Sequence, residues 1–254
     1  MRSIAFLTHK GGAGKTTLAA SLAVAATEAG EKAIALDLDP QASLLRWGKR
    51  REATKAASKI VIEPVEGERL PRLRAILEGL AGVGFTLAIF DTAGADNAAA
   101  RFVTEAVDLC LLPARPTRLD VDATAATFRA VFLAKRKAAF VLNQCPPAYR
   151  SSRASDSAKD LSRLGVLAEP VLSARMDFQD AISAGLGVTE YAREGRAAQE
   201  IEALWNWTRA QFAGTQSRTP ADNQQRRQAA ARGARNAPRP KRTVAERTAS
   251  PVKE

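Results

Sequence analysis

Cysteine, histidine and long apolar runs are scarce in this chain. Two of its 254 residues are cysteines, Cys110 and Cys145, and one is a histidine, His9. The cysteines lie far apart and form no Cys-x-x-Cys pair, which argues against a zinc or iron–sulfur site within one chain. No stretch of about 18 apolar residues occurs, so we expect no membrane-spanning helix. The N-terminal residues lack the basic start and apolar centre of a signal peptide, and we therefore expect a cytoplasmic protein.

The C-terminal segment 214–254 has no aromatic residue and few large apolar ones. It holds ten Lys and Arg against three Asp and Glu, and so carries seven of the eleven net positive charges of the chain. Such a segment cannot bury enough apolar surface to offset the entropy lost on ordering. We therefore expect a folded domain at 1–213 and a disordered basic tail at 214–254. This tail is too poor in large apolar residues to form an amphipathic membrane helix.

The rest of the chain alternates short apolar runs with helical patterns. The runs predict strands at 4–7, 33–38, 60–65, 87–90, 107–112, 138–142 and 166–172. Between and after them the sequence predicts helices at 16–29, 42–57, 70–81, 97–105, 121–135, 155–164, 178–184 and 197–212. Continuous apolar strands flanked by helices are typical of an α/β fold, with a mostly parallel sheet covered on both faces. Ligands of such sheets bind at the carboxyl ends of the strands.

A glycine-rich segment lies between the first predicted strand and the first predicted helix. Its residues are Lys10, Gly11, Gly12, Ala13, Gly14, Lys15, Thr16 and Thr17. Glycines let backbone amides surround a phosphate, and the following helix presents its positive N-terminus. Lys15 would supply charge to the β and γ phosphates, and Thr16 would offer a hydroxyl to Mg²⁺. A glycine turn without a ligand is the alternative, but the strand–loop–helix context favours a P-loop that binds ATP and Mg²⁺.

This segment departs from the ordinary phosphate-binding pattern. The pattern's first glycine would stand at position 9, which is His9, and a second lysine stands at Lys10. In this departure the segment resembles the deviant Walker A box of the ParA/MinD family of ATPases, and most of all the small plasmid-type ParA partition proteins. The resemblance covers about residues 1–212. It implies that Lys10 reaches across a nucleotide-sandwich homodimer to the phosphates of the partner; a solvated loop lysine is the alternative.

Two acidic motifs extend the resemblance at the ends of later strands. Asp37-Leu-Asp39-Pro-Gln is similar to the second box of the family, and residues 87–94 resemble a Walker B strand ending at Asp91. The resemblance implies that Asp39 orients the attacking water and that Asp37 supports Mg²⁺ and its water network. Asp91 would hold Mg²⁺, a cation that prefers oxygen ligands and keeps several waters. Gly94 would let the following loop respond to the γ-phosphate. Helix capping is the alternative for Asp37 and Asp39.

Further segments match the family outside the phosphate site. Residues 111–116 through Asp120 resemble the segment after the next strand of ParA proteins. Asn143 stands where the family places an adenine-contacting asparagine, although a turn residue is common at a strand end. Residues 185–190 and the last helix resemble the C-terminal part of plasmid-type ParA proteins. No helix-turn-helix extension precedes the first strand, so we do not expect recognition of an operator sequence.

Three basic clusters outside the tail are candidate contacts for non-specific DNA. Charge clusters are usually solvated, and basic residues suit the C-terminal end of a helix. The resemblance favours DNA binding, because ParA dimers bind DNA without sequence preference. The candidates are Arg46, Lys49, Arg50 and Arg51, then Lys135, Arg136 and Lys137, and finally Arg150 and Arg153.

The resemblance therefore implies a partition ATPase with catalytic residues Lys10, Lys15 and Asp39. It would dimerise on ATP, associate with nucleoid DNA, and leave it after hydrolysis that is slow alone and stimulated by a ParB-like partner. Within the family, the alternatives are a positioner of a protein cargo and a conjugation accessory ATPase. Outside it, they are an ATP-dependent metabolic ligase of P-loop fold and a DNA-binding protein that holds ATP as a structural ligand.

Overall fold

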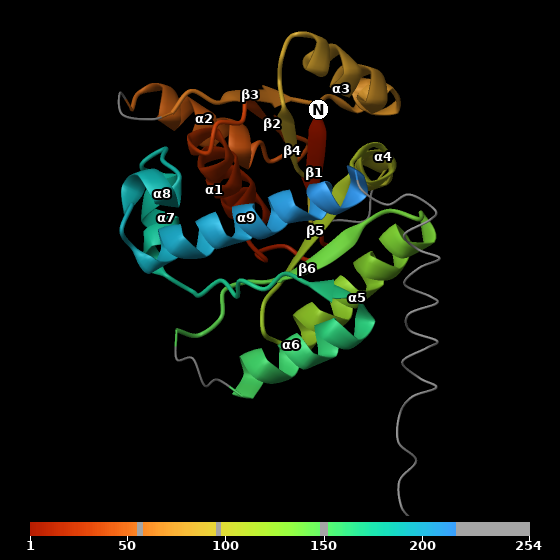
Figure 1. The fold of residues 1–254 in the computed structure, drawn as a ribbon, viewed down its shortest axis with the longest axis vertical. Coiled ribbons are helices and arrows are strands. Elements are labelled where there is room, and N and C mark those ends of the chain that lie inside the picture. Colours follow the sequence, from red (N-terminus) through yellow and green to blue (C-terminus); the bar gives the residue numbers. More distant parts are fainter. Residues whose placement is uncertain (55–57, 95–97, 148–151, 217–254) are drawn as a thin grey trace, which may run out of the picture. The chain divides into compact units, whose positions relative to one another are not determined.

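A seven-stranded parallel sheet forms the centre of the fold (Figure 1). The computed structural model describes residues 1–54, 58–94, 98–147 and 152–216. The strand order is β3-β2-β4-β1-β5-β6-β7, and every pair of neighbours is parallel. The strands are β1 (Arg2–Phe6), β2 (Ala33–Asp37), β3 (Val61–Pro64), β4 (Leu87–Asp91), β5 (Leu109–Ala114), β6 (Ala138–Leu142) and β7 (Val166–Leu167). The predicted α/β class is confirmed.

Helices cover both faces of the sheet, and the side chains of β1 show why its sequence is continuously apolar. Ile4 and Phe6 pack into one hydrophobic cluster, together with α1 and α9. Ala5 and Leu7 point to the opposite face and join a second cluster with α4, α5 and α6, as the two-residue period of a strand requires. The helices are α1 (Lys15–Glu28), α2 (Ser43–Glu52), α3 (Leu73–Gly82), α4 (Ala98–Ala106), α5 (Arg118–Leu133), α6 (Ser152–Leu164), α7 (Met176–Ser183), α8 (Val188–Tyr191) and α9 (Arg196–Gln216), with a 3₁₀ turn η1 (Gly67–Arg72) before α3.

Several predicted boundaries are wrong for local reasons. The last strand ends at Leu167 instead of 172, because Pro170 has no N–H to donate to a ladder; the chain continues beside β6 through Leu172, whose amide donates to Leu142. Helix α9 continues to Gln216, past the predicted end at residue 212. The four-residue helix α8 was not predicted.

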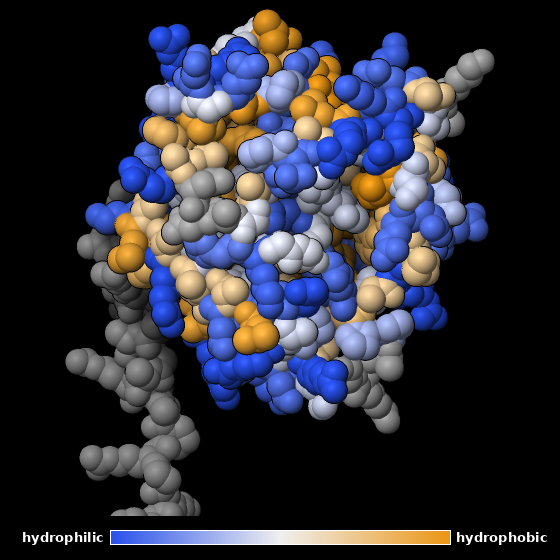
Figure 2. Space-filling view, turned by 180° about the vertical axis from the view of Figure 1, so that it is seen from behind, coloured by the Kyte–Doolittle hydropathy of each residue, from blue (hydrophilic) through white to orange (hydrophobic). Residues whose placement is uncertain are grey.

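The described surface is mixed in polarity. On the face shown in Figure 2, hydrophobic residues occur in small groups separated by hydrophilic ones. None of the helices within the described residues is both long enough and apolar enough to cross a bilayer. Residues 1–212 form one compact unit, and the tail residues after 216 lie outside the described part of the chain.

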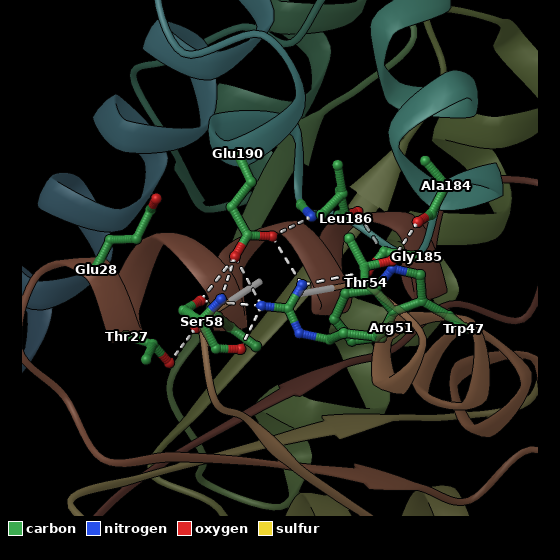
Figure 3. A network of polar contacts seen from close by, with 12 residues as sticks. Thr27, Glu28, Trp47, Arg51, Thr54, Ser58, Ala184, Gly185, Leu186 and Glu190 are labelled. Carbon is green, nitrogen blue, oxygen red and sulfur yellow. Dashed lines mark hydrogen bonds and ion pairs between the residues drawn. The ribbon is translucent and has the colours of Figure 1, made fainter. Parts of the chain in front are cut away.

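A buried ion pair joins α2 to α8 (Figure 3). Arg51 is 5% exposed and donates to both carboxylate oxygens of Glu190 at 2.7 Å, and also to the carbonyl of Gly185 at 3.2 Å. Burial raises the pKa of Glu190, but hydrogen bonds from Arg51 and from the amides of Gly187 and Ser58 bring it below its ordinary value. The prediction that Arg51 contacts DNA is therefore wrong, because its guanidinium is enclosed by these partners.

The backbone at Gly185 explains how the two segments approach so closely. Gly185 has a φ of 73°, and a Cβ there would lie 2.6 Å from the amide nitrogen of Arg51. Only glycine fits this combination of left-handed backbone and close approach. The indole N–H of Trp47 donates to the carbonyl of Leu186 at 3.2 Å on the same side of α2. The ion pair and this contact together fix α2, which follows the Asp37–Asp39 segment.

We predict that Arg51→Ala lowers the free energy of unfolding by about 3–5 kcal/mol, because Glu190 then remains buried without its cation. Lys49→Ala is the control, since Lys49 is an exposed residue of the same helix. Urea unfolding followed by circular dichroism measures both effects. Equal unfolding midpoints for the two variants would show that the ion pair does not hold α2 in place.

Candidate functional site

The phosphate loop, residues 10–17, joins the carboxyl end of β1 to α1. Gly12 and Gly14 have φ values of 78° and 92°, a region that favours glycine. Among the described residues no side chain caps the first turn of α1, and this turn contains no acidic residue. Lys15 begins the helix and is 7% exposed. The helix therefore presents uncapped amides and its positive dipole end beside a buried lysine, an arrangement that fits phosphate groups.

Two side chains from the end of β6 hold the phosphate loop in place. The Asn143 amide donates to the carbonyl of Ala13 at 2.8 Å, and the Gln144 amide donates to the carbonyl of Gly12 at 2.9 Å. A Cβ on Gly14 would lie 2.5 Å from the Asn143 nitrogen, so this clamp tolerates only glycine. Sequence reasoning singled out Asn143 but missed Gln144, whose only signal is its place directly after Asn143.

A cavity of about 250 Å³ lies beside this clamp. Asn143 and Gln144 form part of its wall together with residues 173–176 at the start of α7 and with Gly14 of the loop. The cavity adjoins the phosphate loop and is large enough for part of a nucleotide. Contact between Asn143 and adenine stays a prediction, since the hydrogen bond of its side-chain nitrogen goes to the loop.

Asp91 is fully buried at the end of β4, and neither carboxylate oxygen has a hydrogen-bond partner among the residues that the structure describes. Burial raises its pKa to about 7; the nearby Thr16 hydroxyl and the charge of Lys15 oppose this, while Asp37 and Asp39 add to it. A buried carboxylate with unsatisfied oxygens requires a cation or hydrogen-bond donors. This carboxylate therefore fits the water shell of a Mg²⁺ ion.

Few protein ligands surround this position. Among the described residues, no group of three or more His, Cys, Asp or Glu side chains is placed to hold a metal ion. Mg²⁺ keeps several waters and is bound through one or two carboxylates plus substrate phosphates, so a small protein share fits this ion. Thr16 and Asp91 are the residues that would hold it.

Asp37 and Asp39 organise the turn between β2 and α2. Asp37 is 3% exposed, and its two carboxylate oxygens accept from the amides of Asp39 and Leu45, both at 3.0 Å. Asp37 is thus a capping residue in this structure, and its support of Mg²⁺ stays a prediction. Asp39 is half-buried and accepts from the amide of Gln41 at 2.9 Å.

Lys15 connects these carboxylates to the phosphate loop. Burial lowers the pKa of Lys15, and the charges of Asp91 and Asp39 oppose this shift. The three groups come from three different segments, β2, β4 and the phosphate loop, and meet at the carboxyl edge of the sheet. The role of Asp39 in orienting water stays a prediction.

Gly94 lies directly against the phosphate loop. A Cβ at this position would lie 3.1 Å from the amide nitrogen of Gly11 and 3.3 Å from the carbonyl carbon of Lys10. Glycine at position 94 therefore lets the segment after β4 approach the backbone of residues 10–11 closely. The neighbouring residues 95–97 lie outside the described residues.

Lys10 lies apart from Lys15 and faces α5. Its ammonium is 3.6 Å from a carboxylate oxygen of Asp120, and its side chain is 35% exposed. The structure thus gives the two lysines different surroundings: Lys15 is buried among carboxylates at the start of α1, and Lys10 is held at the rim of the site.

One of the three basic clusters lies at the edge of the sheet opposite the phosphate loop. Lys135, Arg136 and Lys137 precede β6 and so lie at the amino edge of the sheet, opposite the loop. Arg136 donates to the carbonyl of Glu105. Arg46, Lys49 and Arg50 are exposed on α2, and Arg153 is exposed on α6. Arg150 lies outside the described residues.

Comparison with known proteins decides the family. The family model described as VirC1 protein matches residues 1–199. The chain belongs to the VirC1 family of ParA-like P-loop ATPases. It is 34% identical over 207 residues to maintenance of carboxysome distribution protein A of Gloeobacter kilaueensis, a match that covers 80% of this chain and 89% of that protein. It is 29% identical over 189 residues to protein virC1 of Rhizobium rhizogenes, covering 72% and 80%.

Solved structures support the same fold for this VirC1-family chain. Apo McdA of Cyanthece has a TM-score of 0.69 at 16% identity, covering 82% of this chain and 99% of that one. MinD of Pyrococcus horikoshii, solved with Mg-ADP, has a TM-score of 0.66 at 19% identity, covering 86% and 99%. The predicted ParA/MinD resemblance and P-loop fold are confirmed.

We predict that Asp91→Asn stabilises the nucleotide-free chain at pH 8. The folded-state pKa of Asp91 is about 7 and its ordinary value is 3.8, so the folded chain loses stability as the pH rises from about 4 to about 7. Removing this charge should recover up to about 4 kcal/mol at pH 8 and progressively less towards pH 5. Thermal melts at pH 5 and pH 8 measure the difference.

Asp156→Asn is the control for this prediction, because Asp156 is an exposed carboxylate on α6. It should change the melting temperature little at either pH. The same Asp91→Asn chain should bind ATP more weakly than wild type when Mg²⁺ is present. If Asp91→Asn and wild type melt at the same temperature at pH 8, the ionised Asp91 carboxylate does not destabilise the folded chain.

Proposed function

We propose that this chain is an ATP-switched positioning ATPase of the ParA type. It binds ATP and Mg²⁺ at the phosphate loop and forms a homodimer around the nucleotides. The dimer binds DNA without sequence preference and is released after hydrolysis, which is slow alone and stimulated by a ParB-like partner. The protein is thereby associated with the nucleoid in the cytoplasm, and its cargo is a DNA replicon.

The separation of the two lysines carries this proposal. Lys15 is buried at the start of α1, where it would bind the phosphates of the nucleotide held by the same protomer. Lys10 is a second cation at the rim, paired with Asp120 at 3.6 Å and partly exposed. The side chain of Lys10 lies at the rim of the site, apart from Lys15, so it is not placed to bind the phosphates of its own protomer. In a dimer of facing protomers, each Lys10 would supply a cation to the phosphates bound by the other.

The carboxylates support hydrolysis as the chemical step. Phosphoryl transfer depends on positioning and charge neutralisation. Bound Mg²⁺ would supply the main charge neutralisation for the phosphates. Asp91 would hold the water shell of that ion, Lys15 would bind the phosphates, and Asp39 would accept a hydrogen bond from the attacking water. Asp39 is half-buried, and one of its carboxylate oxygens accepts from the amide of Gln41. Slow turnover without a partner is what the resemblance to ParA proteins implies.

The relatives favour a second candidate with the same switch and a different cargo. The relative from Gloeobacter kilaueensis is named for carboxysome distribution, and a solved neighbour from Borrelia burgdorferi is described as a putative plasmid partition protein bound to AMPPNP. Positioning of a protein cargo is therefore a candidate function in addition to DNA partition. A conjugation accessory ATPase is a third candidate, for which the virC1 relatives provide a comparison.

An ATP-dependent ligase is the alternative from another class. Cobyrinic acid a,c-diamide synthase of Mycobacterium smegmatis shares the fold, with a TM-score of 0.58 at 18% identity. A ligase requires a substrate pocket and no second protomer at the nucleotide. Dimerisation that depends on ATP and on Lys10 thus separates the two classes.

We predict that Lys15→Ala abolishes ATP binding, since the phosphates lose their main side-chain cation. Lys10→Ala should bind a fluorescent ATP analogue with nearly wild-type affinity but should lose hydrolysis. Titration of the analogue and a phosphate-release assay measure the two properties. The proposal of a cation acting in the partner's site fails if Lys10→Ala hydrolyses ATP at the wild-type rate.

We predict that the basic tail and the folded body contribute differently to DNA binding. The tail carries most of the net charge, so it should add affinity that falls steeply with salt and is the same with ADP and ATP. A chain truncated after Gln216 should bind DNA more weakly and with a shallower salt slope, yet still only with ATP, because a dimer joins two weak sites.

The measurement for this prediction is a salt titration of DNA binding for full-length and truncated chains, each with ADP and with a non-hydrolysable ATP analogue. Lys49→Ala and Arg50→Ala in the truncated chain test α2, and Arg163→Ala on α6 is the control. Loss of all binding in the truncated chain at low salt would assign the DNA site to the tail. Equal salt slopes for both chains would show that the tail does not touch DNA.

A further inference from the structure

Asp120 holds two cations at the start of α5. Its side chain is 2% exposed. One carboxylate oxygen accepts from the Nε of Arg115 at 3.1 Å, and the other lies 3.6 Å from the ammonium of Lys10. The Thr117 hydroxyl donates to this second oxygen and also accepts from the Asp120 amide. One buried carboxylate thus serves a lysine of the phosphate loop and an arginine of the segment after β5.

The two cations are held differently. Arg115 makes a hydrogen bond to Asp120, whereas the 3.6 Å separation of Lys10 is that of an ion pair without a hydrogen bond. If Lys10 moves away, Asp120 keeps Arg115 and Thr117. If Arg115 were absent, Asp120 would keep Lys10 as its one cation among these contacts, and separating that pair would leave a buried carboxylate without a counter-charge. Such a charge costs several kcal/mol.

Arg115 also lies beside the phosphate loop. A Cβ on Gly12 would be 3.8 Å from one of its guanidinium nitrogens, and its side chain is 33% exposed. The guanidinium thus borders the loop without being enclosed by it. Burial raises the pKa of Asp120, but hydrogen bonds from Thr117 and Arg115 and the charges of Arg115 and Lys10 lower it below its ordinary value. The ionised form of Asp120 is therefore favoured, and its buried charge is offset by these two cations.

We propose that Arg115 is a positioning residue that releases Lys10 for the dimer. It neutralises Asp120 permanently, so that Lys10 leaves its ion pair at little cost when a second copy of the chain approaches with bound ATP. Asp120 keeps the lysine at the rim in the monomer, and Arg115 limits how tightly it does so. This inference rests on the proposed function, in which Lys10 acts across the dimer.

Three variants test the proposal: Arg115→Gln, Asp120→Asn, and the two combined. Without Arg115, Asp120 should hold Lys10 more tightly, so Arg115→Gln should weaken dimerisation with a non-hydrolysable ATP analogue by about tenfold, equivalent to about 1.4 kcal/mol. ATP binding to the monomer should stay unchanged. The double variant should recover dimerisation, because the amide that replaces the carboxylate carries no charge to retain Lys10.

The control is Arg118→Gln, because Arg118 lies in the same segment, is 77% exposed and pairs with Asp122 instead. Sedimentation velocity gives the dimer affinity, a fluorescent ATP analogue gives monomer binding, and thermal melts verify folding. The proposal is overturned if Arg115→Gln dimerises like wild type, if Asp120→Asn does not relieve its defect, or if monomer ATP binding falls equally. A wild-type chain that stays monomeric with the analogue would instead contradict the proposed function itself.

Discussion

The uncapped start of α1 is the constraint on which the site depends. The helix begins directly after Gly14, which like Gly12 has a left-handed backbone, and no side chain in the described part of the chain satisfies its first amides. An end of this kind is stable only if an anion or water accepts those amides. The neighbouring segments hold the loop open for such an anion. Asn143 and Gln144 bond to its carbonyl groups, and Gly94 packs against its backbone.

The charged side chains at the carboxyl edge of the sheet lie beside this uncapped helix start. Three carboxylates and Lys15 converge where β2, β4 and the loop end, and Asp91 has buried carboxylate oxygens that no described residue satisfies. The structure therefore retains a cost in stability at this position, which a bound cation and phosphates would remove. Elsewhere the buried carboxylates have counter-charges within the fold. Glu190 forms an ion pair with Arg51, and Asp120 pairs with Lys10 and Arg115.

Much of this arrangement was predictable from the sequence, since glycine spacing and apolar runs are local signals. They gave the phosphate loop, the parallel sheet and the positions of Asp39 and Asp91 at strand ends. The contacts that join distant segments were not predictable. Arg51 reads as one more basic residue of α2, and only the fold brings Glu190, 139 positions away, against it. Gln144 carries no motif, and Arg115 lies in a family-like segment that does not indicate its contacts; the roles of both depend on which loop the fold places beside them. Pro170 shortened a strand that its apolar neighbours suggested was longer.

The central claim is that bound ATP brings two copies of this chain together. Sedimentation velocity of the wild-type chain with Mg²⁺, first with ADP and then with a non-hydrolysable ATP analogue, tests it most directly. The account predicts a monomer with ADP and a dimer with the analogue, with the dimer lost again when Mg²⁺ is chelated. The same sedimentation coefficient in both nucleotide states would contradict it.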